Sequence, residues 1–494
     1  MVEIEKTVGE EGKELVIHKK VPNHGAIFKE LIDIVGEEYV MDKSASLFVY
    51  SGDMTENVPH MPEFVVAPIT VDEVQKIILL ANREKIPIVP FVSGSNLGGL
   101  TIPLEGGIIV DLKRMNKILE VNERDQYAII EAGVTFADIK DYLDKNHPNL
   151  IFTYTYATPA AGVVPNVLLE GLVTLSAKYG TTVAFINGLE AVLPTGEIVK
   201  VGSCATSKYW FSRNPLPDLI GLFTSWQGMT GIVTKIAVQL DPKPAYTGIK
   251  MIMSDEIHES FQLMEELGRA QICDNIIMFN WGLAFAVIQM PREIAGSEKD
   301  ESAPTIYLEM DYSAVNTIKE LEAKEEIIES LAKKYECGLW DYKDVGDGIT
   351  KVLDVPMTFA GLFTHGPGGL TWIGAYGPCS QYETAWNVAN EVFSRHPRFT
   401  PWLYAKTFKN GHFGAMRTLI GFDRSNAEEV RETRVLIREM AKELMDIGYI
   451  PYKTPVEIAK MILERSDPNF ALFMKKIKNS LDPNRIMNPG RWGL

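Results

Sequence analysis

A run of small residues near position 95 sets the strictest limit on how the first part of this chain can fold. It reads Ser93-Gly-Ser-Asn-Leu-Gly-Gly99 and follows a short apolar strand expected over residues 86–92. A helix is expected before that strand, over 71–85, because apolar residues recur there at helical spacing. Small side chains let consecutive backbone N–H groups form a concave nest that approaches a pyrophosphate closely. The segment therefore predicts an anion-binding loop, with an ordinary surface turn as the alternative.

The surroundings of this loop differ from the glycine fingerprint of βαβ nucleotide-binding units. The loop has no Gly-x-Gly-x-x-Gly pattern, and residues 108–112 after it are expected to form a strand rather than a helix. A nicotinamide-binding βαβ unit is therefore not expected at this place.

Composition limits the classes of partner. The chain has 494 residues, of which 46% are hydrophobic, so we expect two or three domains with cores of their own. Its formal net charge of −16 would repel nucleic acids and anionic membranes. The four cysteines lack Cys-x-x-Cys spacing, which argues against a zinc site or an iron–sulfur cluster, and no metal is expected. A small-molecule substrate is the expected partner.

Hydropathy gives no sign of a leader peptide or a membrane anchor. The first residues do not combine a basic segment with an apolar one, and no apolar run reaches spanning length. The sequence thus predicts a soluble, cytoplasmic protein without membrane insertion.

Changes of pattern along the chain predict three regions. Strands and helices alternate over 1–244, and the proline pair at the end of Asp241-Pro-Lys-Pro244 marks the first boundary. Long amphipathic helices separated by strands fill 245–447, and 448–494 is expected to return to the first region. Within these regions we expect a capping box at Thr135 and another at Ser425, and a hairpin that turns at Pro194-Thr-Gly196.

Three motifs in order carry a family resemblance. They are Ser93-Gly-Ser-Asn-Leu-Gly-Gly99, Gly228-Met-Thr-Gly-Ile-Val-Thr234 and Asp482-Pro-Asn-Arg-Ile-Met-Asn-Pro-Gly490. Over nearly its whole length the chain resembles the vanillyl-alcohol oxidase / p-cresol methylhydroxylase superfamily of PCMH-type FAD-binding flavoproteins, nearest to the branch that oxidises 4-alkylphenols. The resemblance implies an α+β fold, in which an FAD-binding domain of two α+β subdomains carries an α+β cap domain over the flavin. It also implies a C-terminal tail that returns to the FAD-binding domain.

The resemblance also assigns cofactor contacts residue by residue, while a simple turn is the alternative for each glycine and a solvated surface cation is the alternative for Arg491. The implied FAD contacts are Pro90, Val92, Ser93, Gly94, Ser95, Asn96, Leu97, Gly98, Thr158, Pro159, Gly162, Asn166, Gly231, Ile232, Val233, Asn488 and Arg491. The histidine that anchors FAD covalently in vanillyl-alcohol oxidase falls near Leu370 here, so a non-covalent FAD is expected.

A narrower likeness concerns the substrate. The segment Gly448-Tyr-Ile-Pro-Tyr-Lys-Thr454 is similar to the Gly-x-x-x-Tyr-Arg-Thr segment that binds phenolate in the 4-alkylphenol branch, which implies that role for Tyr452 and Lys453. Lysine in place of arginine keeps the charge and loses the planar fork. The second phenolate-binding tyrosine of that branch is missing from 96–100, and its flavin-side carboxylate is replaced by Ala160.

Other side chains leave alternatives open. His412, in Asn410-Gly-His-Phe-Gly414, is either a general base near the substrate or a structural histidine. The aromatic runs 372–376 and 401–404 either line a substrate cavity or belong to the core.

Taken together, the residues and the resemblance predict an FAD-dependent oxidoreductase. It would transfer a hydride from an alcohol or benzylic C–H, in a 4-hydroxybenzyl-like substrate, to flavin N5. One alternative is a 2-hydroxy-acid dehydrogenase whose substrate carboxylate pairs with Lys453 or Arg417, and another is a flavin-binding electron-transfer subunit of a larger complex. The resemblance further implies a homodimer, and an electron-acceptor protein is a candidate partner.

Overall fold

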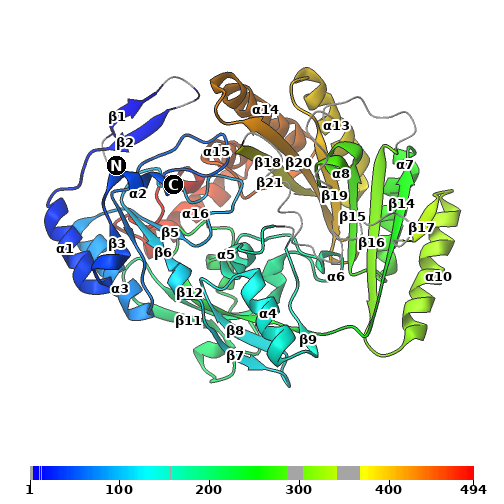
Figure 1. Ribbon diagram of the computed structural model, residues 1–494, viewed down its shortest axis with the longest axis horizontal. Helices are drawn as coiled ribbons and strands as arrows, with labels where there is room; N and C mark the ends of the chain where they lie inside the picture. Colours follow the sequence, from blue (N-terminus) through cyan, green and yellow to red (C-terminus); the bar gives the residue numbers. More distant parts are fainter. Residues whose placement is uncertain (1–3, 10–11, 13, 156, 288–303, 342–367) are drawn as a thin grey trace.

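In the described residues, the computed structural model has three large sheets arranged around the middle of the molecule (Figure 1). It also has two two-stranded sheets, β1 (Ile4–Val8) with β2 (Leu15–His18) and β9 (Leu150–Ile151) with β13 (Asp241–Pro242). It describes residues 1–494 except 1–3, 10–11, 13, 156, 288–303 and 342–367. In the described residues no helix is both long enough and apolar enough to cross a membrane. Two of the three large sheets come from the first half of the chain and the third, which is the largest, from the second half.

The first sheet positions the glycine loop. It has the order β3 (Val40–Met41), β4 (Phe64–Val66), β6 (Ile108–Asp111) and β5 (Ile88–Phe91). The last three strands are parallel, and β4 and β6 are buried throughout, as their unbroken apolar sequence predicts for strands covered on both faces. Helix α3 (Val71–Glu84) begins at Thr70, whose side chain accepts from the Glu73 N–H. The glycine loop follows β5 directly, so the expected order of helix, strand and loop is confirmed.

The second sheet is antiparallel and shares a hydrophobic core with the first, beside which it lies (Figure 1). Its order is β11 (Ile198–Gly202), β10 (Ile186–Val192), β12 (Ile232–Gln239), β8 (Tyr127–Glu131) and β7 (Ile118–Asn122). The expected hairpin is present, with Val192 paired to Ile198. The capping box of helix α4 (Phe136–Asn146) is also confirmed, because Thr135 and Asp138 each accept a hydrogen bond from the other's backbone N–H.

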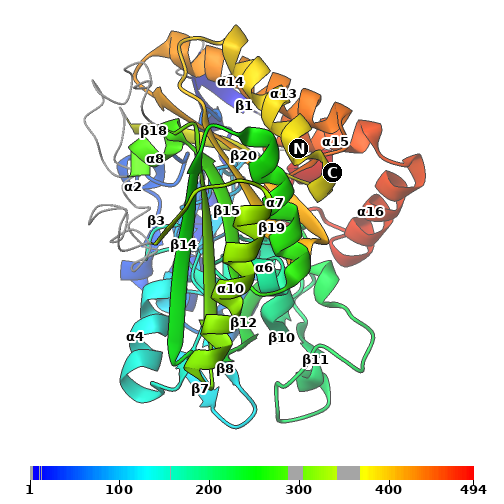
Figure 2. The same ribbon diagram turned by 90° about the vertical axis from the view of Figure 1, so that its right-hand side faces the viewer.

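The third sheet, called the cap sheet below, has eight strands, and every described pairing within it is antiparallel. Its order is β17 (Leu339–Asp341), β14 (Tyr246–Ser254), β16 (Ile306–Ala314), β15 (Asn275–Asn280), β19 (Trp402–Phe408), β20 (Phe413–Asp423), β18 (Gly368–Gly377) and β21 (Ile450–Tyr452). Figure 2 shows helices packed across its outer face. They are α7 (Ile257–Ala270), α10 (Ile318–Lys334), α13 (Tyr382–Arg395) and α14 (Ala427–Asp446).

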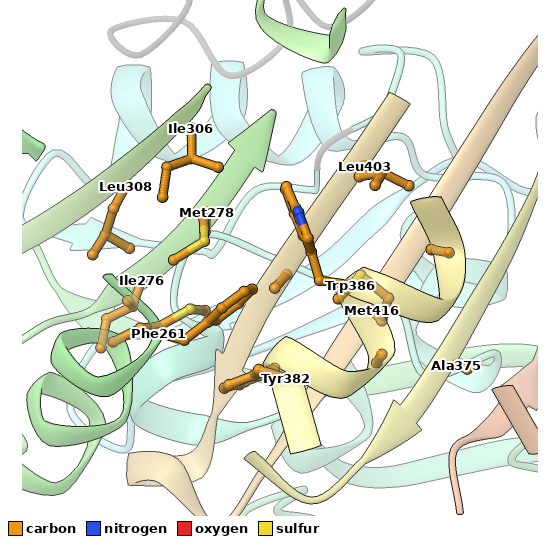
Figure 3. Packing of buried hydrophobic residues seen from close by; sticks show 14 of the residues in the cluster. Phe261, Ile276, Met278, Ile306, Leu308, Ala375, Tyr382, Trp386, Leu403 and Met416 are labelled. Carbon is orange, nitrogen blue, oxygen red and sulfur yellow. The ribbon is translucent and has the colours of Figure 1, made fainter. Parts of the chain in front are cut away.

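Alternation along the cap strands separates a core from a second, inner face. In β19 the side chains of Leu403 and Ala405 lie in the large core beneath the helices, whereas Tyr404 belongs to a different aromatic cluster on the opposite face. Figure 3 shows the core, where Trp386 of α13 lies near Met278, Leu403 and Met416. The inner face is therefore free to contribute to a site between the cap sheet and the rest of the chain.

Helix α14 begins one residue later than the sequence predicted. Its N-cap is Asn426, whose Oδ1 accepts from the N–H groups of Glu428 at 3.0 Å and Glu429 at 3.4 Å. Ser425 instead donates its backbone N–H to Asp423. Because serine and asparagine are both good N-caps, the order of the two residues did not decide which would be used.

The C-terminal segment returns to the first sheet. After α15 (Val456–Arg465) and α16 (Pro468–Leu481), Ile486 accepts from the Ile88 N–H at 2.6 Å, and the Asn488 N–H donates to the Ile88 carbonyl at 2.7 Å. Figure 1 shows this red segment beside β5 and β6. The tail thus lies against the strand that leads into the glycine loop.

One buried ammonium holds this tail. Lys478, which is 2% exposed, donates to the Met229 carbonyl at 2.8 Å, to the Met487 carbonyl at 2.7 Å and to the Asp482 carboxylate at 2.5 Å. Asp482 also accepts the N–H groups of Ile486 and Met487. All three ammonium protons are therefore used, as a buried lysine requires.

We expect Lys478→Met to destabilise the protein by about 3–5 kcal/mol, because it leaves the Asp482 carboxylate buried without its cation. Urea denaturation followed by far-UV circular dichroism measures this change in the free energy of unfolding. Lys476→Met is the matched control, since Lys476 is exposed on the same helix. Equal stability of the two variants would contradict the role given to Lys478.

A histidine pair, in which His18 is buried and His60 is partly buried, predicts a loss of stability in acid. His18 Nε2 lies 3.2 Å from His60 Nδ1, and burial lowers the pKa of His60 to about 4, with the nearby His18 adding to the effect. Between pH 6.5 and about 4, the His60 imidazole is therefore protonated in the unfolded chain and neutral in the folded chain. The free energy of unfolding consequently falls as the pH falls through that window.

The stability that the protein loses on acidification should be about 2 kcal/mol smaller in His60→Gln than in the wild type. This figure allows for the partial exposure of His60. The measurement is the thermal midpoint at pH 7 and pH 4.5. His258→Gln serves as a control because His258 is exposed. A wild-type midpoint that changes with pH no more than that of the His60 variant would argue against this role.

Candidate functional site

A cavity begins at the glycine loop and ends at the inner face of the cap sheet. It holds about 1400 Å³ of empty space, a figure that includes its opening to solvent. Its lining extends from the loop at 93–97 to Trp372, Arg417 and Lys453, so one elongated ligand or two smaller ones could lie along it. Of the cofactor contacts expected from the sequence, those lining the cavity are Pro90, Val92, Ser93, Gly94, Ser95, Asn96, Leu97, Gly162, Asn166, Gly231, Val233 and Asn488.

The glycine loop offers unused backbone donors. The side chains of Ser93 and Ser95 lie 3.0 Å apart, and Ser93 accepts the Gly162 N–H at 3.3 Å. Asn96 Oδ1 accepts two N–H groups later in the loop, which shapes the turn. Within the described ranges, the N–H groups of Gly94, Ser95 and Asn96 have no acceptor of their own. These donors suit the phosphate oxygens of a pyrophosphate.

An unpaired acceptor lies farther along the cavity. Asn166 donates its Nδ2 to Thr155 at 3.2 Å, while its Oδ1 is buried and finds no donor in the part of the chain that the structure describes. An isoalloxazine ring carries an imide N–H that such a carbonyl can accept. The loop donors and this acceptor together fit two parts of FAD, the pyrophosphate in its middle and the flavin ring at one end.

Five of the expected cofactor contacts do not line the cavity: Gly98, Thr158, Pro159, Ile232 and Arg491. Thr158 and Pro159 form a turn against α4, where the Ala137 N–H donates to the Pro159 carbonyl. The side chain of Ile232 lies in the core between the first two sheets. These residues shape the walls of the cavity from behind.

Gly98 brings two distant segments into contact. A Cβ at this position would lie 2.1 Å from the carbonyl oxygen of Lys453, which is far inside any real contact. Only glycine therefore lets the loop approach the residue that follows β21.

The alternative of a solvated cation for Arg491 is wrong. The side chain is 1% exposed and donates from Nη2 to the Ile102 carbonyl at 2.6 Å. Burial lowers its pKa to about 10, and the carboxylate of Asp53 opposes the shift. Arg491 thus fastens the C-terminal tail to the segment after the glycine loop, while the neighbouring Asn488 reaches the cavity.

An arginine on β20 dominates the cap end of the cavity. Arg417 donates from Nη2 to the Tyr452 hydroxyl at 2.6 Å and from Nη1 to the Tyr404 hydroxyl. Its guanidinium carbon lies 3.6 Å from the centre of the Trp372 ring. Tyr376 in turn stacks on Tyr452 with ring centres 4.1 Å apart. The aromatic runs noted in the sequence therefore do both things considered for them. Trp372 lines the cavity, whereas the tyrosines pack behind it.

Lys453 lies at the same end of the cavity, in the left-handed region at φ 51°. Burial lowers its pKa to about 7, the positive charge of Arg417 lowers it further, and Glu170 opposes the shift. No ion pair of Lys453 or Arg417 occurs among the described residues. Among the described residues, the cap end therefore carries positive charge that no carboxylate neutralises in an ion pair.

The three expected catalytic residues fall in different places. Lys453 lines the cavity, Tyr452 lies behind Arg417, and His412 is exposed at the residue before β20, outside the cavity. The position of His412 gives no support to a general base. From the sequence, Arg417 was expected only as an alternative partner for a substrate carboxylate, and Trp372 only as part of an aromatic run. The signal that could have pointed to Arg417 is a lone arginine inside an otherwise apolar strand.

The part of the chain that the structure describes contains no group of three or more His, Cys, Asp or Glu side chains arranged to hold a metal ion.

Comparison with known proteins agrees with this geometry. A family model described as an FAD binding domain matches residues 62–202. The flavoprotein subunit of the hydroxylating 4-cresol dehydrogenase of Pseudomonas putida is 26% identical, over 93% of this chain and 94% of its own. The glycolate oxidase subunit GlcD of Bacillus subtilis is 25% identical, over 94% of this chain and 96% of its own.

Two solved structures share the fold. The crystal structure of p-cresol methylhydroxylase with bound substrate superposes with a TM-score of 0.84 at 23% identity, covering 96% of this chain and 98% of its own. A 4-ethylphenol oxidase from Gulosibacter chungangensis gives a TM-score of 0.86 at 21% identity, covering 96% and 99%. The expected α+β architecture, an FAD-binding part with a large antiparallel cap sheet, is confirmed.

Gly98→Ala tests the contact between the glycine loop and Lys453. The added methyl group has to displace backbone, so we expect a loss of about 1–3 kcal/mol in stability together with a lower flavin content after purification. Thermal unfolding and the ratio of 450 nm to 280 nm absorbance measure the two effects. Gly25→Ala is the control, because a Cβ there meets nothing within 4 Å. Equal behaviour of the two variants would show that the contact is not tight.

Proposed function

We propose that this chain is an FAD-linked oxidoreductase of the PCMH-type flavoprotein family and that it oxidises a small substrate with an oxyanion by removing a hydride from an alcohol or benzylic carbon. A 4-alkylphenol or 4-hydroxybenzyl-like substrate is the first candidate. The observation that carries the proposal is the cavity itself, which joins a loop suited to a pyrophosphate to an end with Arg417 and Lys453. A cofactor at one end and an anionic substrate at the other would meet in its middle.

FAD, when bound, supplies the hydride acceptor. The chain contributes the donors of 94–96 for the pyrophosphate and Asn166 for the flavin ring. It places the substrate between the cofactor and the cap sheet and limits the access of water. With a pKa near 7, Lys453 can take the proton from the substrate hydroxyl, and the ammonium that forms then stabilises the oxyanion.

A second candidate substrate is a 2-hydroxy acid. The specific observation in its favour is Arg417, a guanidinium that lines the cavity, stays charged at any ordinary pH and has an Nε without an acceptor among the described residues. The glycolate oxidase subunit at 25% identity supports the same alternative.

Anaerobic mixing of the holoprotein with each substrate class decides between the candidates. We expect 4-methylphenol, 4-ethylphenol or 4-hydroxybenzyl alcohol to bleach the 450 nm flavin band faster than glycolate or D-lactate. Faster bleaching by the hydroxy acids would favour the second candidate. If none of them reduced the flavin while dithionite did, both candidates would fall, and a role as an electron-transfer subunit would become the better explanation.

The pH dependence tests the role of Lys453. Because the neutral amine is the form that accepts a proton, kcat/KM should rise as the pH rises through about 7 and then level off. In Lys453→Arg the side chain stays charged, so this limb should disappear and kcat/KM should fall about tenfold to a hundredfold. A profile that fell through pH 7 in the wild type would mean that the ammonium is the active form.

We also propose that the FAD is held without a covalent bond. The position implied for covalent attachment carries Leu370, an apolar side chain on β18 that is 4% exposed and does not line the cavity. After acid precipitation, the yellow colour should remain in the supernatant. Colour in the pellet would reveal a covalent link to another residue.

A further inference from the structure

Two buried N–H groups at the cap end of the cavity lack an acceptor. Arg417 Nε and Trp372 Nε1 are both buried, and neither finds a hydrogen-bond partner within the described ranges. Both residues line the cavity. Buried donors in folded proteins are nearly always paired, so an unpaired donor on a residue that lines a cavity points to a ligand there.

The guanidinium of Arg417 is fixed in one orientation. Its two terminal nitrogens donate to the hydroxyls of Tyr404 and Tyr452, and its plane lies over Trp372 at 3.6 Å. It cannot turn to find another acceptor without breaking these contacts. The two tyrosine oxygens are used as acceptors, and Tyr452 itself does not line the cavity.

The charge at this place selects the ligand. Arg417 is a cation, Lys453 lies at the same end of the cavity, and no ion pair of either residue is found in the described chain. Arg417, Trp372 and Lys453 line the same cavity, and each of them carries an N–H group that could donate to a bound group there. An oxyanion has enough lone pairs to accept all three, and its charge offsets that of the arginine.

We propose that Arg417, Trp372 and Lys453 form the subsite that holds the oxyanion of the substrate, with Tyr404 and Tyr452 as positioning residues behind Arg417. This inference rests on the proposed function and changes the assignment made from the sequence, where Tyr452 contacts the substrate directly. The oxyanion is the shared chemistry of a phenolate and of a carboxylate.

The test uses Trp372→Phe, which removes the indole N–H and keeps a ring under the guanidinium. Binding to the FAD-loaded protein is followed by the change in the visible flavin spectrum. The probes are benzoate and 4-chlorophenol, which carry the two kinds of oxyanion and no C–H that the enzyme would oxidise. We expect the dissociation constant of the better probe to rise about tenfold to a hundredfold in Trp372→Phe, the loss of one hydrogen bond to a charged group.

Two further variants complete the design. Trp386→Phe makes the same change in the core on the other face of the cap sheet, and it should leave the dissociation constant within about twofold. Tyr404→Phe removes one of the two oxygens that orient Arg417, so it should weaken the better probe by less than Trp372→Phe does. A flavin content equal to that of the wild type shows that each variant has folded.

The outcomes separate the inference from the proposed function. Unchanged binding in Trp372→Phe, or the absence of binding of both probes to the wild type, would overturn the subsite. Weaker binding in Trp372→Phe supports the subsite, even when no substrate reduces the flavin and the proposed function falls. Preference of the wild type for 4-chlorophenol indicates a phenolate, and preference for benzoate indicates a carboxylate.

Discussion

The buried ammonium of Lys478 is the interaction on which the site depends. Its three acceptors are the carboxylate of Asp482 at the end of α16, the carbonyl of Met487 in the C-terminal tail and the carbonyl of Met229 in the turn that precedes β12, so one charge joins the end of the chain to a segment about 250 residues earlier. The tail pairs with β5, and β5 leads into the glycine loop. The position of the loop therefore depends on a hydrogen-bond network that lies outside the cavity.

The cap sheet builds its core and the site from the same strands. Alternation directs Leu403 and Ala405 of β19 toward the helices and Tyr404 toward the cavity. On the neighbouring β20, Arg417 pairs with Tyr404 across the strands, which brings the guanidinium and the phenol together. A shift of register by one residue would turn both side chains into the core, so burial of the outer face also fixes the geometry of the inner face.

Local patterns predicted more of this protein than long-range contacts did. The strand and glycine loop, the capping box at Thr135 and the hairpin after β10 each depend on neighbours in sequence, and all three are present. The role of Arg417 depends on residues from three other strands or their ends, and the burial of Arg491 depends on a carbonyl from the first third of the chain. The residues next to each arginine in the sequence do not indicate which partners it will have.

The Gly98 contact bears on how ligands enter and leave. The carbonyl of Lys453 lies against the glycine loop, and Leu370 of β18 donates its N–H to Met54 at 3.0 Å, so the edge of the cap sheet is fastened to the first half of the chain at two places. A swing of the cap sheet as one rigid body would have to break both attachments. Movement of a single side chain that lines the cavity leaves both attachments in place.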